Sequence, residues 1–98
     1  MVSKFRDKYH PKVKKDLRKI DKSVESEVRD LHIPKILRDP YIADDLTGDL
    51  AGIRSYHFKK EKVQYRISHI IDDAEKIVNI LMIGKRESFY EILRRRLN

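Results

Sequence analysis

The chain of 98 residues contains no cysteine and no tryptophan, and only three glycines and three prolines. Without cysteine it can form no disulfide, no thiolate metal site and no cysteine nucleophile, which fits a reducing compartment. Residues 1–16 lack the apolar segment of a signal peptide, and the longest nearly apolar run, residues 77–84, is too short to span a membrane. No repeat or Gly/Ser linker is visible. We therefore expect one domain over residues 1–98, in the cytoplasm and without a membrane partner.

Charged residues are abundant, and the two signs are separated along the chain. Residues 1–22 hold nine Lys or Arg against three acids, whereas residues 23–50 hold three against seven. Residues 85–98 are basic again, and the formal net charge of the whole chain is +7. This asymmetry is typical of a face that binds a polyanion such as nucleic acid, although a solvated surface would have the same composition.

Hydrophobic periodicity predicts helices in the first 40 residues. An apolar stripe at spacings of three and four residues runs through Val13, Leu17, Ile20, Val24, Val28 and Leu31. Pro11 suits a first helical turn, and Ser23, with acids behind it, is the expected N-cap of a second helix. Pro34 then predicts a kink or a new short helix. We expect two antiparallel helices that share one core face, followed by a loop over residues 41–52.

From residue 53 onward the hydrophobic period changes to two, which predicts strands at Ile53–Lys59, Val63–Ile71 and Ile77–Ile83. The second strand places Tyr65, Ile67 and His69 on one face and Arg66 on the other. The third strand is apolar on both faces, as in a central strand. A weak first strand within residues 2–9 and a short C-terminal helix complete the order β–α–α–β–β–β–α, which is an α+β pattern.

Three motifs carry a resemblance to a known family. The first is the lysine-rich helix KKDLRKI (14–20), and the second is LTGDLAGIRSYHF (46–58) followed by YRISHII (65–71). The third is ILMIGKRESFY (80–90), an apolar strand that leads into Gly-Lys-Arg and then a tyrosine. With the order of the elements, these motifs give the chain a resemblance to the RelE/ParE toxin superfamily, and the resemblance covers almost the whole chain. The third motif is characteristic of the RelE side.

The resemblance implies a fold, a function and partners. The expected fold is a helical hairpin packed on a small twisted antiparallel sheet, with a basic groove and a short C-terminal helix. The expected protein is a toxin of a type II toxin–antitoxin system, silenced by a cognate antitoxin. RelE-like toxins cleave mRNA on the ribosome, whereas ParE-like relatives inhibit DNA gyrase. The GKRESFY ending favours the RNase, with the gyrase inhibitor as the alternative and an inactive partner-binding module as a third possibility.

Metal-independent RNA cleavage needs a base for the ribose 2′-OH, a cation for the negative charge of the phosphorane-like transition state, and a proton for the leaving oxygen. The resemblance assigns Arg66 to the phosphate clamp and Arg86 to charge stabilisation or leaving-group protonation. It assigns Tyr90 to base stacking or to orienting the nucleophile, with Phe89 as the alternative ring. His57 stands where some relatives carry lysines, and histidine suits acid–base work near neutral pH. An ordinary structural role remains the alternative for each residue.

The remaining basic side chains are expected to contact the RNA backbone without reading its sequence. They are Arg54, Lys59, Lys60, Lys62 and Lys85. His69 shares the apolar face of its strand and is expected in the core, while His10 and His32 are weaker candidates for chemistry. No histidine pair has metal-ligand spacing and the acids form no cluster, so no metal and no cofactor is expected.

Overall fold

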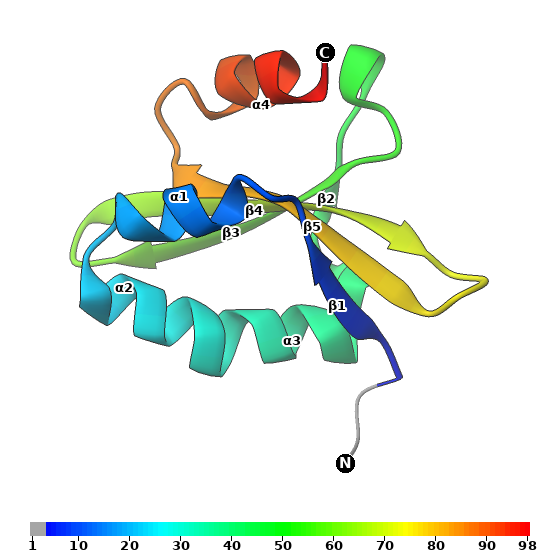
Figure 1. Ribbon diagram of the computed structural model, residues 1–98, viewed down its shortest axis with the longest axis horizontal. Coiled ribbons are helices and arrows are strands. Elements are labelled where there is room, and N and C mark those ends of the chain that lie inside the picture. Colours follow the sequence, from blue (N-terminus) through cyan, green and yellow to red (C-terminus); the bar gives the residue numbers. More distant parts are fainter. Residues whose placement is uncertain (1–3) are drawn as a thin grey trace.

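The computed structural model describes residues 4–98 and places a five-stranded sheet between two helical layers (Figure 1). The sheet order is β1-β5-β4-β3-β2. The strands are β1 Arg6–Tyr9, β2 Asp44–Asp45, β3 Arg54–Lys60, β4 Val63–Asp72 and β5 Ile77–Lys85. The predicted α+β class is confirmed, with one difference. The sheet is mixed rather than purely antiparallel, because β1 pairs with β5 in parallel while the other strand pairs are antiparallel. Residues 2 and 3 of the predicted first strand lie outside the described residues.

The helices lie on opposite faces of this sheet. The N-terminal helices are α1 Val13–Arg18, α2 Lys22–Glu27 and α3 Ile33–Arg38, and the C-terminal helix is α4 Phe89–Leu97. Figure 1 shows α2 and α3 as one rod below the sheet, α1 beside β5, and α4 above the sheet near a 3₁₀ turn at Gly48–Leu50. Within residues 4–98, no helix has the length and apolar character needed to cross a bilayer.

At Pro34, where a kink or a new short helix was expected, the short helix α3 begins in line with α2 (Figure 1). A π-helical turn, Val28–His32, joins α2 to α3, and the N–H of Ile33 bonds to the carbonyl of Val28 five residues earlier. This wider turn gives room to the proline ring, which would clash with the preceding turn of a regular helix. The prediction that Leu31 belongs to the apolar stripe is therefore wrong: the π turn rotates the stripe, Leu31 is 50% exposed, and the buried face continues through Ile33 and Ile36.

The second helix also starts earlier than predicted. Its N-cap is Asp21 rather than Ser23, which is exposed within the first turn of α2. The expected loop over residues 41–52 instead contains the edge strand β2 and two 3₁₀ turns, Pro40–Ile42 and Gly48–Leu50. The Arg54 guanidinium holds the start of this segment against β3, because it donates to the carbonyl of Ala43 at 2.9 Å.

One irregularity in β5 decides which side chains reach each layer. Ser68 of β4 pairs with Met82, but His69 pairs with Ile80, so Leu81 is an extra residue in β5. Such a bulge reverses the alternation of side chains beyond it. As a result Leu81 and Met82 both pack toward α4, while Ile80 on one side of the bulge packs with the N-terminal helices.

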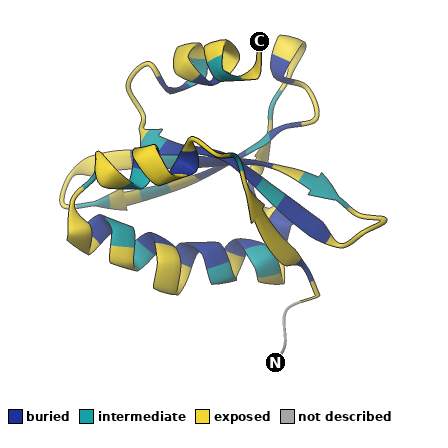
Figure 2. Ribbon diagram, in the orientation of Figure 1, coloured by how far each residue is buried: buried dark blue, intermediate teal, exposed yellow. Residues whose placement is uncertain are grey.

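The core accordingly has two parts, and Figure 2 shows the buried residues concentrated in the sheet and on the helix faces that cover it. The larger part joins the inner faces of α1–α3 to β3, β4 and β5, including Ile36, Ile67 and Ile80 at 0% exposure. The smaller part lies under α4 and consists of Leu50, Ile53, Leu81, Met82, Phe89 and Leu93. The side chains of the candidate site border this smaller core.

Candidate active site beneath helix α4

His57 and Arg66, two of the predicted catalytic residues, are direct partners across the β3–β4 ladder. Directly opposed side chains of an antiparallel pair lie within about 5.5 Å at Cβ. Their strand positions alternate with the core residues Tyr56 and Ile67, so they face the α4 side of the sheet. Tyr90, in the first turn of α4, completes the group from above.

The ring of Tyr90 supports the Arg66 guanidinium, whose carbon lies 4.8 Å from the ring centroid. A cation over an aromatic face is attracted by the ring quadrupole. The Tyr90 hydroxyl donates to Ser55 Oγ at 3.1 Å, and Ser55 is buried in β3. Among residues 4–98 no carboxylate pairs with Arg66. Its planar fork therefore stays available for an anion such as phosphate, which guanidinium groups bind through two parallel hydrogen bonds.

His57 is partly exposed, and its environment favours the neutral form. Burial lowers the pKa of His57, the positive charge of Arg66 lowers it further, and the Asp44 carboxylate opposes both effects. Its Nε2 lies 3.8 Å from Asp44 Oδ2, and the imidazole side chain is 44% exposed. A neutral imidazole near pH 7 can accept a proton, as a general base must.

A hollow of about 450 Å³ opens beside His57, between the end of α3 and the edge of β3. Its lining consists of Lys35, Ile42, Ala43, Asp44, Ser55, Tyr56 and His57. A larger apolar hollow, of about 710 Å³, lies away from this cluster, between β1, α1 and the α2–α3 rod. Of the predicted catalytic residues only His57 lines the smaller hollow. The candidate site is therefore defined by the pairing of His57 with Arg66 and by the contact of Arg66 with Tyr90, not by a cavity.

Arg86 and Phe89, the other two candidate site residues of the third motif, have different environments in the structure. The Arg86 N–H donates to the Gln64 carbonyl at 2.9 Å, which carries the strand ladder beyond β5, and the exposed Arg86 side chain has no partner within residues 4–98. Phe89 is 1% exposed and packs edge to face against Tyr90. It cannot stack on a base from this position, so Tyr90 is the available ring.

The predicted RNA-binding residues divide into paired and free side chains. Lys60 forms an ion pair with Glu27 at 3.0 Å on the opposite face of the sheet, and Arg54 is engaged with the backbone of residues 41–43 and the ring of Tyr41. Lys59, Lys62 and Lys85 are exposed. Lys62 lies in the β3–β4 turn, where it and Glu61 have φ of 71° and 51°, as a type I′ hairpin requires.

The other histidines have structural positions. His69 is fully buried, as predicted, and its Nε2 donates to the Pro40 carbonyl at 3.1 Å, while its Nδ1 has no hydrogen-bond partner in the described part of the chain. His32 is buried between Tyr56 and Glu27 with a hydrogen bond of 2.8 Å to each, and His10 Nδ1 accepts from the N–H of Lys12. No group of three or more His, Asp or Glu side chains within residues 4–98 is arranged to hold a metal ion.

Two residues of the cluster were missed by the sequence reasoning. The period of two along the strand predicts that Ser55 lies on the same face as His57, but nothing in the sequence links Ser55 to Tyr90. Asp44 falls in a segment expected to be a loop, and only the pairing of β2 with β3 brings it to His57.

Comparison with known proteins places the chain, though not the candidate site, in a family. The model of the family of ParE-like toxins of type II bacterial toxin–antitoxin systems matches residues 8–94. No curated protein sequence matches the chain.

Several solved structures share the fold. A chain of the RelBE2 toxin–antitoxin complex from Mycobacterium tuberculosis has a TM-score of 0.74 at 24% identity, over 87% of this chain and 100% of that chain. The free Escherichia coli toxin RelE, as an arginine-to-alanine double mutant, has a TM-score of 0.73 at 17% identity, over 99% and 100%. The archaeal RelE–RelB complex from Pyrococcus horikoshii has a TM-score of 0.60 at 21% identity, over 86% and 97%.

Proposed function

We propose that this chain, which belongs to the family of ParE-like toxins of type II bacterial toxin–antitoxin systems, is an endoribonuclease acting on mRNA. The observation that carries the proposal is the Arg66 guanidinium, which rests on the Tyr90 ring, has no carboxylate partner among residues 4–98 and lies opposite His57. An anion-binding fork beside a proton acceptor is the arrangement that RNA cleavage through the 2′-OH requires.

In this proposal His57 takes the proton of the ribose 2′-OH, and the 2′ oxygen attacks the adjacent phosphorus. Arg66 binds the non-bridging oxygens as their charge grows, and a preorganised cation of this kind lowers the barrier without rearranging during the reaction. Arg86, which is exposed at the end of β5 with no partner among residues 4–98, adds positive charge near the leaving 5′ oxygen. That oxygen takes up a proton from water as the P–O5′ bond breaks. The products are a 2′,3′-cyclic phosphate and a 5′-hydroxyl.

Tyr90 has two tasks in this mechanism. Its ring holds Arg66 in place, and it is the ring on which we expect a base to stack. The exposed Lys59, Lys62 and Lys85 extend the positive surface along the RNA backbone, so binding to RNA or to the ribosome is expected to weaken steeply with salt.

We also infer that a cognate antitoxin silences this chain. Structures that share its fold include complexes of RelE with RelB from Escherichia coli and from Pyrococcus horikoshii. The basic ends of the chain, within a net charge of +7, suit an acidic partner.

Inhibition of DNA gyrase is the second candidate function. The specific observation in its favour is that the matching family is described as ParE-like. A gyrase inhibitor needs no proton acceptor beside Arg66, so the two functions differ in their dependence on the His57–Arg66 pair.

The test is pulsed expression in a bacterial host, followed by primer-extension mapping of a reporter mRNA. The matched control for Arg66→Ala is Arg94→Ala, which removes the same charge from an exposed arginine of α4. Discrete cuts that persist in Arg94→Ala and vanish in Arg66→Ala are expected. Growth arrest with intact mRNA and DNA-damage signalling would contradict the RNase function and favour inhibition of DNA gyrase.

A further inference from the structure

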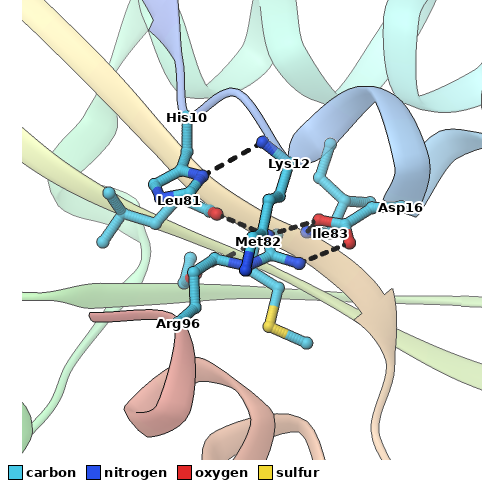
Figure 3. A network of polar contacts seen from close by, with 8 residues as sticks. His10, Lys12, Asp16, Leu81, Met82, Ile83 and Arg96 are labelled. Atoms are coloured by element: carbon cyan, nitrogen blue, oxygen red, sulfur yellow. Dashed lines mark hydrogen bonds and ion pairs between the residues drawn. The ribbon is translucent and has the colours of Figure 1, made fainter. Parts of the chain in front are cut away.

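Asp16 and Arg96 form a buried ion pair that joins the two ends of the chain (Figure 3). Two guanidinium nitrogens of Arg96, in the last turn of α4, donate to the two carboxylate oxygens of Asp16 in α1, each at 2.7 Å. The side chains are 8% and 7% exposed. Bidentate pairs of this geometry are the strongest arginine–carboxylate contacts, and they fix orientation as well as distance.

The pair also occupies a gap in the sheet. In the described part of the chain, β1 pairs only with residues 77–80 of β5, so the next stretch of β5 has no strand neighbour on that side. Asp16 Oδ2 accepts the N–H of Ile83 at 3.0 Å, and Arg96 donates to the carbonyl of Leu81 at 2.8 Å. Buried backbone groups left unpaired are costly. The ion pair therefore satisfies the two backbone groups that flank Met82 at the bulge.

This arrangement determines how α4 is held. The helix has nine residues, too few to be stable in isolation, and its apolar contacts come mainly from Phe89 and Leu93 in the smaller core. Arg96 adds a polar anchor at the end of the helix farthest from Tyr90. A rigid helix fixed at both ends holds Tyr90 at one height over Arg66, whereas a helix fixed only at its first turn can tilt.

We infer that Asp16 and Arg96 are positioning residues for the Arg66–Tyr90 pair: they dock the end of α4 so that the ring keeps the guanidinium oriented. The inference rests on the proposed function, because its consequence is read in RNA cleavage. Neither residue reaches the RNA in this arrangement, since both side chains are buried between α1, β5 and α4. Their loss acts through the geometry of the site.

The same helix supplies a matched control. Arg94 forms an ion pair with Asp49 at 2.7 Å, but the two side chains are 46% and 63% exposed. Exposed pairs of this kind contribute little to stability. Arg94→Met therefore removes an arginine from α4 without removing the buried anchor.

The experiment compares the double variant Asp16→Asn/Arg96→Met with Arg94→Met and the unaltered chain. The introduced asparagine keeps an oxygen for the N–H of Ile83, and methionine fills the volume of the arginine stem, so the fold is retained. Hydrogen exchange of the α4 amides, including that of Ile92, reports docking directly. In the double variant we expect exchange in α4 to rise about tenfold or more while the sheet stays protected, and kcat for RNA cleavage to fall about tenfold with KM nearly unchanged. Arg94→Met should change neither quantity more than about twofold.

A third measurement separates positioning from general destabilisation. If the anchor acts through Tyr90, then the triple variant, which combines Tyr90→Ala with the double variant, should have a kcat close to that of Tyr90→Ala alone. If the double variant does not fold, Arg96→Lys replaces it, because lysine keeps the charge but cannot bind both oxygens of Asp16 and the Leu81 carbonyl in one plane.

Unchanged α4 exchange, or full additivity with Tyr90→Ala, would overturn the inference. If the unaltered chain cleaves no RNA, the proposed function fails, and the exchange measurement alone decides whether Asp16 and Arg96 anchor the helix.

Discussion

Replacing Tyr90 by phenylalanine or by alanine separates the two parts of this side chain. The ring carries the Arg66 guanidinium at 4.8 Å, whereas the hydroxyl is committed to the buried Ser55 Oγ. If the ring is the working part, Tyr90→Phe keeps the phosphate clamp and loses only a structural hydrogen bond. Tyr90→Ala removes the support of the guanidinium as well as its edge-to-face contact with Phe89.

The expected magnitudes follow from these contacts. Loss of one hydrogen bond destabilises by about 1 kcal/mol, which in a domain of this size lowers Tm by roughly 4–8 °C. Alanine also loses a cation–π contact and an aromatic pair, each about 0.5–1.5 kcal/mol, for a total of about 2–4 kcal/mol. In catalysis, Tyr90→Phe should stay within about threefold of the unaltered chain, while Tyr90→Ala should lose about 100-fold through misplacement of Arg66.

The assay is single-turnover cleavage of a labelled RNA, with thermal unfolding measured on the same samples. The cleavage rates are measured well below the Tm of each variant, so that differences in stability do not change them. If Tyr90→Phe loses as much activity as Tyr90→Ala, the hydroxyl takes part in the chemistry, and its bond to Ser55 cannot be its working arrangement. If both variants cleave at the unaltered rate, the ring does not support Arg66 during the reaction.

Three further predictions concern protonation and packing. Because burial and Arg66 lower the pKa of His57 below its ordinary value of 6.5, the cleavage rate should hold as pH falls through 6.5 and drop only below it; a pH–rate profile with its inflection at or above 6.5 contradicts this. Burial lowers the pKa of His69, so the folded state resists a proton that the unfolded chain accepts. The stability contributed by neutral His69 is therefore present above an ordinary histidine pKa of about 6.5 and lost as pH falls, and His69→Gln should flatten the decline of Tm between about pH 7 and 5; an unchanged decline refutes it. Ile36→Ala should lower the free energy of unfolding in urea by about 2–5 kcal/mol, and Leu31→Ala should lower it by less than about 0.5 kcal/mol. The reverse order would indicate a regular helix, with Leu31 on its buried face, in place of the π turn.

The strands were predictable because their information is local. The alternation in β4 placed Tyr65, Ile67 and His69 toward the core and Arg66 on the other face, and the structure confirms this division. The same parity argument applies to Ser55 and His57. A period of two is defined by neighbouring residues of one strand, so it can be recognised without knowledge of the fold. The α+β class followed from the order of these periods, and the family match confirms the resemblance drawn from the motifs.

The irregular positions were not predictable in the same way. The stripe through Val28 pointed to Leu31, but the π turn that accommodates Pro34 moved the buried face to Ile33 and Ile36. The extra residue Leu81 in β5 likewise has no local signature, since the strand is apolar on both faces. A one-residue insertion shifts every following side chain, and only packing against both layers selects where it occurs.

The amino-acid pattern was enough to predict the α+β class, the faces of β4 and the family. It missed the edge strand β2, and the residues that it offered for a nuclease site stay a prediction. Which of these residues meet was decided by the folded chain alone. Tyr90 bonds to Ser55 across 35 positions of the chain, and Arg96 bonds to Asp16 across 80. Phe89 is buried and Lys60 is paired with Glu27, so neither side chain is available to bind RNA. Periodicity reports the face on which a side chain lies, but burial and pairing depend on what the rest of the chain packs against that face.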